Sequence, residues 1–198
     1  TRIQNASIKA FFTNENNLIL SAATAQGKTE AAFLPAISKI KSWEKGIKII
    51  YISPLIALIN DQFKRISDMC FDMDIPITSW HGEASKSKKD KLIANPRGIV
   101  LITPESIEAL LSDKSEIASK FFSEVNYIIV DEIHSFLIGN RGLQLRSLLE
   151  RILRYTYNPP RMIGLSATIG EENYNLSKKF FNNGTNTPAT IPPAKPLL

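Results

Sequence analysis

Short apolar runs alternate along the chain with longer segments in which apolar positions recur every three or four residues. The runs at 17–23 and 47–53 are apolar almost throughout, which is typical of strands buried on both faces. After the second run, five apolar residues share one predicted helical face: Leu55, Leu58, Ile59, Phe63 and Ile66. The pattern therefore predicts that each of these apolar runs is a strand and that a helix follows it.

The same alternation continues to about residue 181. It predicts further strands at 75–80, 98–102, 126–130 and 162–165, and helices at 28–41, 86–94, 105–111, 143–155 and 172–181. Strands of this kind separated by helices indicate an α/β fold, in which a mainly parallel sheet is sandwiched between helices. Ligands of such sheets bind beyond the carboxyl ends of the strands, so we expect the functional residues there.

Composition narrows the class of protein. The 198 residues, 43% of them hydrophobic, suffice for one substantial core. No apolar run is long enough to span a membrane, no signal layout is present, and the single Cys70 is expected in a reducing cytoplasm. His81 and His134 lack cysteine neighbours, so no zinc site is expected. The net charge of +5 is compatible with a polyanionic partner but does not require one.

Residues 22–30 read AATAQGKTE and follow the first predicted strand. Backbone N–H groups in such a turn, together with the positive end of the next helix, form a site for phosphate oxygens. Lys28 would reach the terminal phosphates and the Thr29 hydroxyl would bind Mg²⁺. The strict phosphate-loop pattern has glycine where this chain has Ala22. On these residues alone, a simple turn in which Gly27 relieves backbone strain remains an alternative.

The predicted strand at 126–130 ends in two adjacent acids, Asp131 and Glu132. An apolar strand that delivers carboxylates at its tip suits a magnesium site. Asp131 would hold Mg²⁺ and Glu132 would orient and deprotonate an attacking water. The alternative is an ordinary helix cap. Paired with the GKT sequence about a hundred residues earlier, the acids favour a nucleotide site.

Several segments in this order resemble the superfamily-two helicases, and nearly the whole chain is covered. TRIQ at the start resembles the adenine-reading glutamine motif, SAATAQGKTEA motif I, SPLIALINDQ motif Ia and TPESIEALL motif Ib. DEIH resembles motif II in its DExH form, and SAT resembles motif III. The stretches RGLQLRSLLERI and LSATIG look most similar to the large helicase-related (Lhr-like) group of DNA helicases.

The resemblance implies a RecA-like domain that binds ATP and Mg²⁺. Its ATP contacts would be Gln4, Thr24, Ala25, Gln26, Gly27, Lys28, Thr29 and Glu30, with Lys28, Asp131 and Glu132 in catalysis and Thr29 and Asp131 on the metal. The residues that couple ATP to movement would be His134, Ser166, Ala167 and Thr168. Family members accept alanine at the Ala22 position. Ala25 replaces a commoner glycine, at a cost of about 1 kcal/mol if that position has positive φ.

In this family the ends of the second, third and fourth strands grip the backbone of a single nucleic-acid strand without reading sequence. The corresponding residues are Pro54, Leu55, His81, Gly82, Thr103, Pro104 and Glu105. Thr103 and Pro104 are equally the residues expected where a strand ends and a helix begins. The basic stretch from Lys86 to Arg97 could steer phosphate or form a solvated helix face, and Trp43 and Trp80 could stack bases or simply pack.

We expect residues 1–182 to form the domain and 183–198, rich in proline, to lead as an extended segment to a second RecA-like domain. The resemblance implies that this second domain supplies an arginine worth about 10³–10⁵ in rate, so the chain alone should hydrolyse ATP poorly. The leading hypothesis is the first motor domain of a DNA helicase or translocase. An RNA helicase and a non-catalytic binding module with a residual nucleotide pocket are the alternatives.

Overall fold

The computed structural model describes residues 1–23, 25–113, 115–167, 171–181 and 189–191. Its strands are β1 (Leu18–Ser21), β2 (Gly46–Ile52), β3 (Ile77–Trp80), β4 (Arg97–Ile102), β5 (Tyr127–Val130), β6 (Arg161–Ser166) and β7 (Ala189–Ile191). They form one sheet in the order β3-β4-β2-β5-β6-β1-β7, and every pairing is parallel. The predicted α/β fold with a parallel sheet is confirmed.

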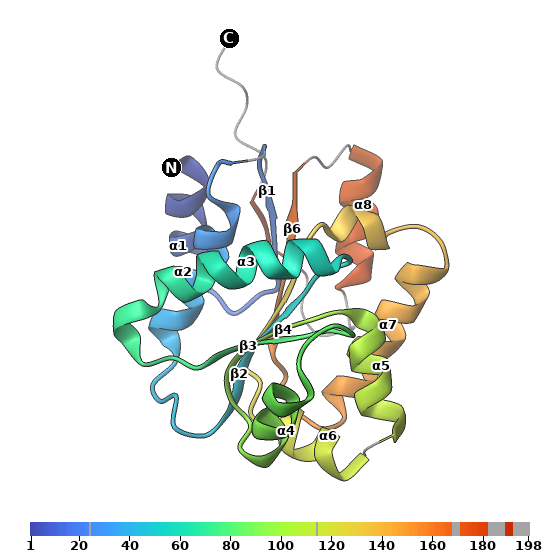
Figure 1. The fold of residues 1–198 in the computed structure, drawn as a ribbon. Helices are drawn as coiled ribbons and strands as arrows, with labels where there is room; N and C mark the ends of the chain where they lie inside the picture. Colours follow the sequence, from blue (N-terminus) through green and yellow to red (C-terminus); the bar gives the residue numbers. More distant parts are fainter. Residues whose placement is uncertain (24, 114, 168–170, 182–188, 192–198) are drawn as a thin grey trace.

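Helices cover both faces of the sheet (Figure 1). They are α1 (Arg2–Thr13), α2 (Lys28–Lys39), α3 (Ile56–Met69), α4 (Lys86–Ala94), α5 (Pro104–Asp113), α6 (Ser115–Phe122), α7 (Asn140–Leu153) and α8 (Glu171–Phe180), with short 3₁₀ turns η1 (Phe71–Met73) and η2 (Ile133–Phe136). Apolar residues of α1, α2 and α3 belong to one core cluster, and those of α4 to α8 belong to the other.

Alternation along the central strands separates these two cores. In β2, Ile50 and Ile52 enter the α4–α8 core, whereas Ile49 and Tyr51 enter the α1–α3 core. Successive side chains of a strand point to opposite faces, and all four are fully buried. This explains why the strands are apolar at consecutive positions rather than at every second one.

Apolar periodicity does not by itself predict α1. The helix begins with a capping box between Thr1 and Gln4 and packs along α2, where the Ser7 hydroxyl donates to the Ala31 carbonyl (2.5 Å). Helix α6 also lies outside the predicted elements. Residues 183–188 and 192–198 of the expected exit segment lie outside the described ranges, and 189–191 form β7 beside β1.

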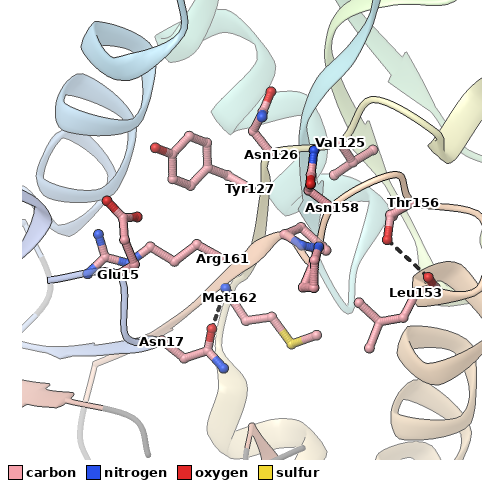
Figure 2. A pocket seen from close by; sticks show the side chains of 12 residues that line it. Glu15, Asn17, Val125, Asn126, Tyr127, Leu153, Thr156, Asn158, Arg161 and Met162 are labelled. Atoms are coloured by element: carbon pink, nitrogen blue, oxygen red, sulfur yellow. Dashed lines mark hydrogen bonds between the residues drawn. The ribbon is translucent and has the colours of Figure 1, made fainter. Parts of the chain in front are cut away.

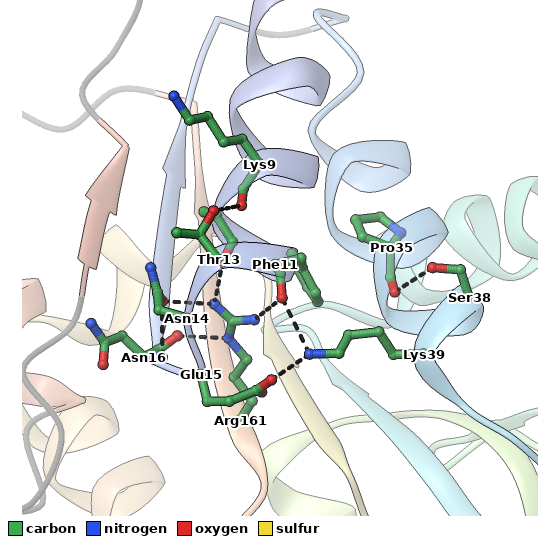
Figure 3. A network of polar contacts seen from close by, with 11 residues as sticks. Lys9, Phe11, Thr13, Asn14, Glu15, Asn16, Pro35, Ser38, Lys39 and Arg161 are labelled. Carbon is green, nitrogen blue, oxygen red and sulfur yellow. Dashed lines mark hydrogen bonds and ion pairs between the residues drawn. The ribbon is translucent and has the colours of Figure 1, made fainter.

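A buried guanidinium fixes the amino edge of the sheet. Arg161, 5% exposed, begins β6 and donates to the carbonyls of Asn16 (2.6 Å), Phe11 (3.4 Å) and Ala10 (3.3 Å) and to the side-chain oxygen of Asn14 (3.4 Å). These acceptors surround the carboxyl end of α1, where a cation also complements the helix dipole (Figure 3). Arg161 therefore fastens α1 to the sheet.

Candidate nucleotide and nucleic-acid site

The carboxyl ends of β1, β6 and β5 are neighbours because these strands are adjacent in the sheet. The Ala22 amide after β1 donates to the Ser166 carbonyl at the end of β6 (3.2 Å). The Asp131 amide after β5 donates to the Ile52 carbonyl at the end of β2 (2.8 Å). Parallel topology thus brings the predicted phosphate loop, the acids and motif III to one edge of the sheet.

The loop between β1 and α2 has the backbone of an anion site. Gly27, with φ of 81°, is the N-cap of the 12-residue α2, and no side chain caps the helix. Its terminal N–H groups are therefore available to an anion. Ala25 has φ of 62°, as the glycine usual at that position would suggest. Thr24 lies outside the described residues.

Lys28 bends back over this loop. Its ammonium donates to the carbonyls of Ala22 (2.7 Å) and Ala23 (3.1 Å). Burial lowers the pKa of Lys28, and the nearby charges of Glu132 and Asp131 act against that lowering. The ammonium and both carboxylates therefore lie in one electrostatic neighbourhood, as the nucleotide hypothesis requires.

Asp131 is held in a fixed orientation. It is 8% exposed, accepts a hydrogen bond from the Tyr51 hydroxyl, and accepts another at Oδ1 from the Glu132 amide (2.9 Å). Burial raises the pKa of Asp131, whereas the Tyr51 hydrogen bond and the charge of Lys28 favour the carboxylate. Tyr51 is a site residue that the sequence did not indicate, since it reads as one more buried strand residue.

Glu132 adopts a left-handed backbone conformation, with φ of 45° and ψ of 48°. Such a conformation costs a non-glycine residue about 1–2 kcal/mol and is often found at functional sites. His134 Nδ1 lies 3.1 Å from Glu132 Oε2 and 3.1 Å from Ser166 Oγ. The predicted catalytic acid and two predicted coupling residues are therefore in contact. Ala167 follows directly, and Thr168 lies outside the described residues.

Other predicted nucleotide contacts surround the loop. The side-chain nitrogen of Gln4 lies 2.6 Å from where a Cβ on Gly27 would stand, so Gln4 adjoins the loop from α1. The Thr29 hydroxyl is buried and bonds Gln62 of α3 (3.1 Å). Glu30 of α2 accepts a hydrogen bond from Arg65 Nε of α3 (2.8 Å), which places α3 beside the phosphate loop. Gln26 is exposed.

The predicted nucleic-acid contacts follow β2, β3 and β4, which adjoin one another in the other half of the sheet. Pro54 is half-buried and Leu55, Gly82 and Glu105 are exposed, whereas His81, Thr103 and Pro104 are buried. The Thr103 hydroxyl accepts from the Ser106 amide (3.3 Å), so it caps α5 as the simpler interpretation expects.

Two buried polar atoms at these strand ends lack partners. Ser53 Oγ, after β2, and His81 Nδ1, after β3, make no hydrogen bond to any described residue. Burial lowers the pKa of His81, which favours the neutral ring. Buried polar groups without partners are rare and call for an explanation, and a ligand that bonds them is one.

Arg141 joins two of the predicted nucleic-acid segments. From the first turn of α7 its Nη2 donates to the Pro54 carbonyl (3.1 Å) and lies 3.7 Å from Glu105 Oε1. Its neighbour Gly142 leaves no room for a side chain, since a Cβ would stand 2.0 Å from the Phe136 carbonyl. The RGLQLRSLLERI stretch indicated this helix but did not indicate these contacts.

A separate cavity of about 570 Å³ lies at the opposite edge of the sheet, around the amino ends of β5 and β6 (Figure 2). Asn17 lines it, but its amide already donates to the Phe181 carbonyl (3.0 Å) and accepts from the Met162 amide (2.8 Å). Arg161 also lines the cavity, but its guanidinium already donates to main-chain carbonyls at and just after the end of α1. This cavity contains none of the predicted site residues.

The fold, together with the carboxyl edge that carries the phosphate loop and the acids, defines a RecA-like nucleotide-binding domain of the helicase type. The model of the DEAD/DEAH box helicase family matches residues 1–176, so the chain belongs to that family.

Relatives agree with this assignment. The chain is 36% identical over 184 residues to the ATP-dependent helicase Lhr-Core of Methanocaldococcus jannaschii, covering 84% of this chain and 21% of the relative. It is 35% identical over 173 residues to the Lhr-Core helicase of Methanothermobacter thermautotrophicus, covering 77% and 19%. The chain thus spans about a fifth of these curated relatives. The resemblance to Lhr-like helicases is confirmed.

Solved structures have the same fold. The Mycobacterium smegmatis helicase Lhr bound to ssDNA and AMP-PNP superposes with a TM-score of 0.83 at 28% identity, covering 98% of this chain and 26% of that one. The DEAD-box helicase Mss116 bound to ssRNA and UDP-BeF gives a TM-score of 0.80, covering 98% and 40%. At 21% identity the second likeness shows the fold alone.

Proposed function

We propose that the chain is the ATP-binding first motor domain of a DNA helicase or translocase, in which ATP turnover moves a nucleic-acid strand. The observation that carries the proposal is the position of Lys28, which bonds the Ala22 carbonyl beside an uncapped helix N-terminus, at the same end of the sheet as Asp131 and Glu132. These groups come from segments a hundred residues apart, and together they suit a metal-bound triphosphate.

The loop amides and Lys28 would hold the phosphates, and Gln4, which adjoins Gly27, would contact the adenine. Glu132 would orient the attacking water and accept its proton, while the contact with His134 keeps its carboxylate in place. Because His134 also contacts Ser166, the state of the phosphate site would be passed to the end of β6. A second RecA-like domain would complete the site from the open side.

Mg²⁺ fits the donors at this edge. Asp131 and Thr29 present oxygen atoms, which Mg²⁺ prefers, and the ion would neutralise charge on the phosphates. Among the described residues, no cluster of three or more His, Cys, Asp or Glu side chains is arranged around a metal position. Magnesium at nucleotide sites needs only one or two protein ligands, because phosphates and water supply the rest.

Single-stranded DNA is the proposed track, and the partnerless Ser53 hydroxyl and His81 ring support a ligand at the ends of β2 and β3. Because β4 lies between β2 and β3, separate phosphate or sugar oxygens along the strand could bond Ser53 and His81 without reading sequence. The DExH sequence and the likeness to the Mycobacterium smegmatis Lhr structure with ssDNA favour DNA over RNA. Comparing the stimulation of ATP turnover by single-stranded DNA and RNA in the complete protein separates these substrates. If neither single-stranded DNA nor RNA stimulates ATP turnover, a non-catalytic binding module would be favoured.

The setting we propose is the cytoplasm. In the described ranges, no helix has the length and apolar character to cross a bilayer, and Cys70 is a buried free thiol. A buried unpaired cysteine is compatible with a reducing compartment.

Replacing Lys28 tests the nucleotide site. Lys28→Ala removes a charge-assisted contact, so calorimetry should show ATP binding weakened by about 10–100-fold. Lys9→Ala, on the exposed side of α1, is the matched control and should bind as the unchanged chain does. Melting curves of all three proteins verify folding. Equal ATP affinity for folded Lys28→Ala and Lys9→Ala would refute the site.

A further inference from the structure

Strand β3 is an open edge of the sheet. It pairs with β4 alone, and the Ile99 amide donates to the Pro76 carbonyl (2.8 Å). Backbone groups alternate in direction along a strand, so Thr78 and Trp80 also face β4, whereas Ile77 and Ser79 face outward. Among the described residues, nothing bonds the outward amides and carbonyls of Ile77 and Ser79.

A slot runs along this edge. A cavity of about 370 Å³ is lined by Ile77, Thr78 and Ser79 and by Phe63 of α3 and Leu92 of α4. Phe63 packs with the core on one face of the sheet, and Leu92 belongs to the core on the other. The cavity therefore sits at the β3 side of the sheet between the two helical layers, where one more strand would lie.

The slot continues beyond the start of β3. A second hollow of about 370 Å³ shares Pro76, Ile77 and Arg97 with the first. Phe71 also lines it and is 84% exposed. Apolar walls on both sides of unpaired main-chain groups are the features by which a sheet edge binds an extended peptide.

The rim of the slot is basic. Lys88, Lys91 and Arg97 line the first hollow, and none of them forms an ion pair within the part of the chain that the structure describes. Asp74 is the acidic residue in the lining of the second. Three unneutralised cations disfavour pairing with another copy of a chain whose net charge is +5, and they favour an acidic strand.

We propose that the β3 edge is a docking site for an extended acidic peptide segment of a partner protein, which adds to the sheet as a strand beside Ile77 and Ser79. Its main chain bonds the outward amides and carbonyls, its apolar side chains contact Phe63 and Leu92, and its carboxylates meet Lys88, Lys91 and Arg97. The site does not depend on the proposed motor function.

Nuclear magnetic resonance on the 198-residue chain tests the site. The probe is an acetylated, amidated peptide of alternating Glu and Val, with Lys-Val and N-methylated Glu-Val peptides as controls. The Glu-Val peptide should shift the Ile77 and Ser79 amide signals and protect them from hydrogen exchange, more weakly at high salt. Neither control peptide should do so, because one has the wrong charge and the other cannot pair.

Two pairs of variants locate the binding. Ser79→Pro removes an outward amide and should weaken binding by about tenfold, whereas Ser79→Ala keeps the amide and the affinity. Lys88→Glu/Lys91→Glu should abolish binding, whereas Lys9→Glu/Lys120→Glu makes the same change in net charge away from the slot and should retain most of it. If Ser79→Pro fails to fold, the charge pair decides.

Three results would overturn the proposal. One is the absence of amide shifts at Ile77 and Ser79 at millimolar peptide. Another is equal binding of the Glu-Val and Lys-Val peptides. The third is a thymidine oligonucleotide that shifts the α4 and β3 signals while the peptide does not, since this would make the basic rim a nucleic-acid surface.

Discussion

The strands of the sheet begin at its amino edge and end at its carboxyl edge, and these two edges differ in how their polar groups are satisfied. At the amino edge, Arg161 and Asn17 bond main-chain carbonyls and amides, and nothing more is needed to explain them. At the carboxyl edge, the helix N-terminus at Gly27 is uncapped, and Ser53 and His81 each hold a buried atom without a partner in the described chain.

Backbone strain is concentrated at the carboxyl edge but is not confined to it. Ala25 and Glu132 both have positive φ, and both stand at the carboxyl edge. Asp74, the other such residue in the described ranges apart from glycines, ends η1 just before the open strand β3. An edge whose polar groups are satisfied serves stability, whereas unpaired buried groups beside strained residues indicate binding. Substitutions at the two edges should therefore affect different properties.

The largest effect is expected at Glu132. Glu132→Gln keeps the size of the side chain but cannot accept the proton of the attacking water. ATP turnover of the complete protein, stimulated by single-stranded DNA, should fall by about 10²–10⁴-fold. ATP binding should persist, because the phosphate contacts of the loop and Lys28 remain.

Glu150→Gln, at an exposed position of α7, is the matched control and should leave turnover unchanged. Steady-state turnover and ATP calorimetry on both variants distinguish chemistry from binding. Turnover of Glu132→Gln within a few-fold of the unchanged protein would exclude Glu132 as the base.

At the amino edge the corresponding experiment changes stability instead. Arg161→Met removes a buried donor that links β6 to the end of α1 and leaves the Asn16 carbonyl without its partner, so urea unfolding should show a loss of about 2–4 kcal/mol. ATP affinity, measured where the variant is folded, should change little. Arg154→Met, at an exposed position after α7, should cost less than about 0.5 kcal/mol. A loss for Arg161→Met no larger than that of Arg154→Met would contradict the fastening role.

The sequence predicted the parts of the fold that have a strong period. The strands β2, β4 and β5 are apolar at every core position, and the helix with Leu145, Leu148 and Ile152 buried repeats at helical spacing. Helix α1 could not be found in this way, because Ile8 and Phe12 are exposed and blur its apolar face. It is held to the rest of the fold by Arg161 and by the bond from Ser7 to Ala31, which are contacts between residues distant in the sequence.

Prediction of the site was limited in the same manner. Ordered motifs located Lys28, Asp131 and Glu132, since their spacing is written in the chain. Tyr51 and Arg141 were missed because their roles exist only in the folded protein. Tyr51 of β2 donates to Asp131 at the end of the neighbouring strand β5, and Arg141 of α7 donates to the carbonyl of Pro54, 87 residues earlier. A pattern along one segment carries no record of such pairings.

The smallest effect is expected at Ala25, a residue of the proposed binding loop whose strained backbone should also affect stability. Ala25→Gly removes the penalty of positive φ and should raise the free energy of unfolding by about 0.5–1 kcal/mol, despite the greater freedom of glycine in the unfolded chain. Ala23→Gly, in the same loop but without positive φ, has no such penalty to remove and should destabilise slightly. Urea denaturation of both variants measures the difference. If Ala25→Gly is the less stable of the two, the left-handed conformation at Ala25 is not strained, and the contrast between the edges must depend on Glu132 and the partnerless atoms alone.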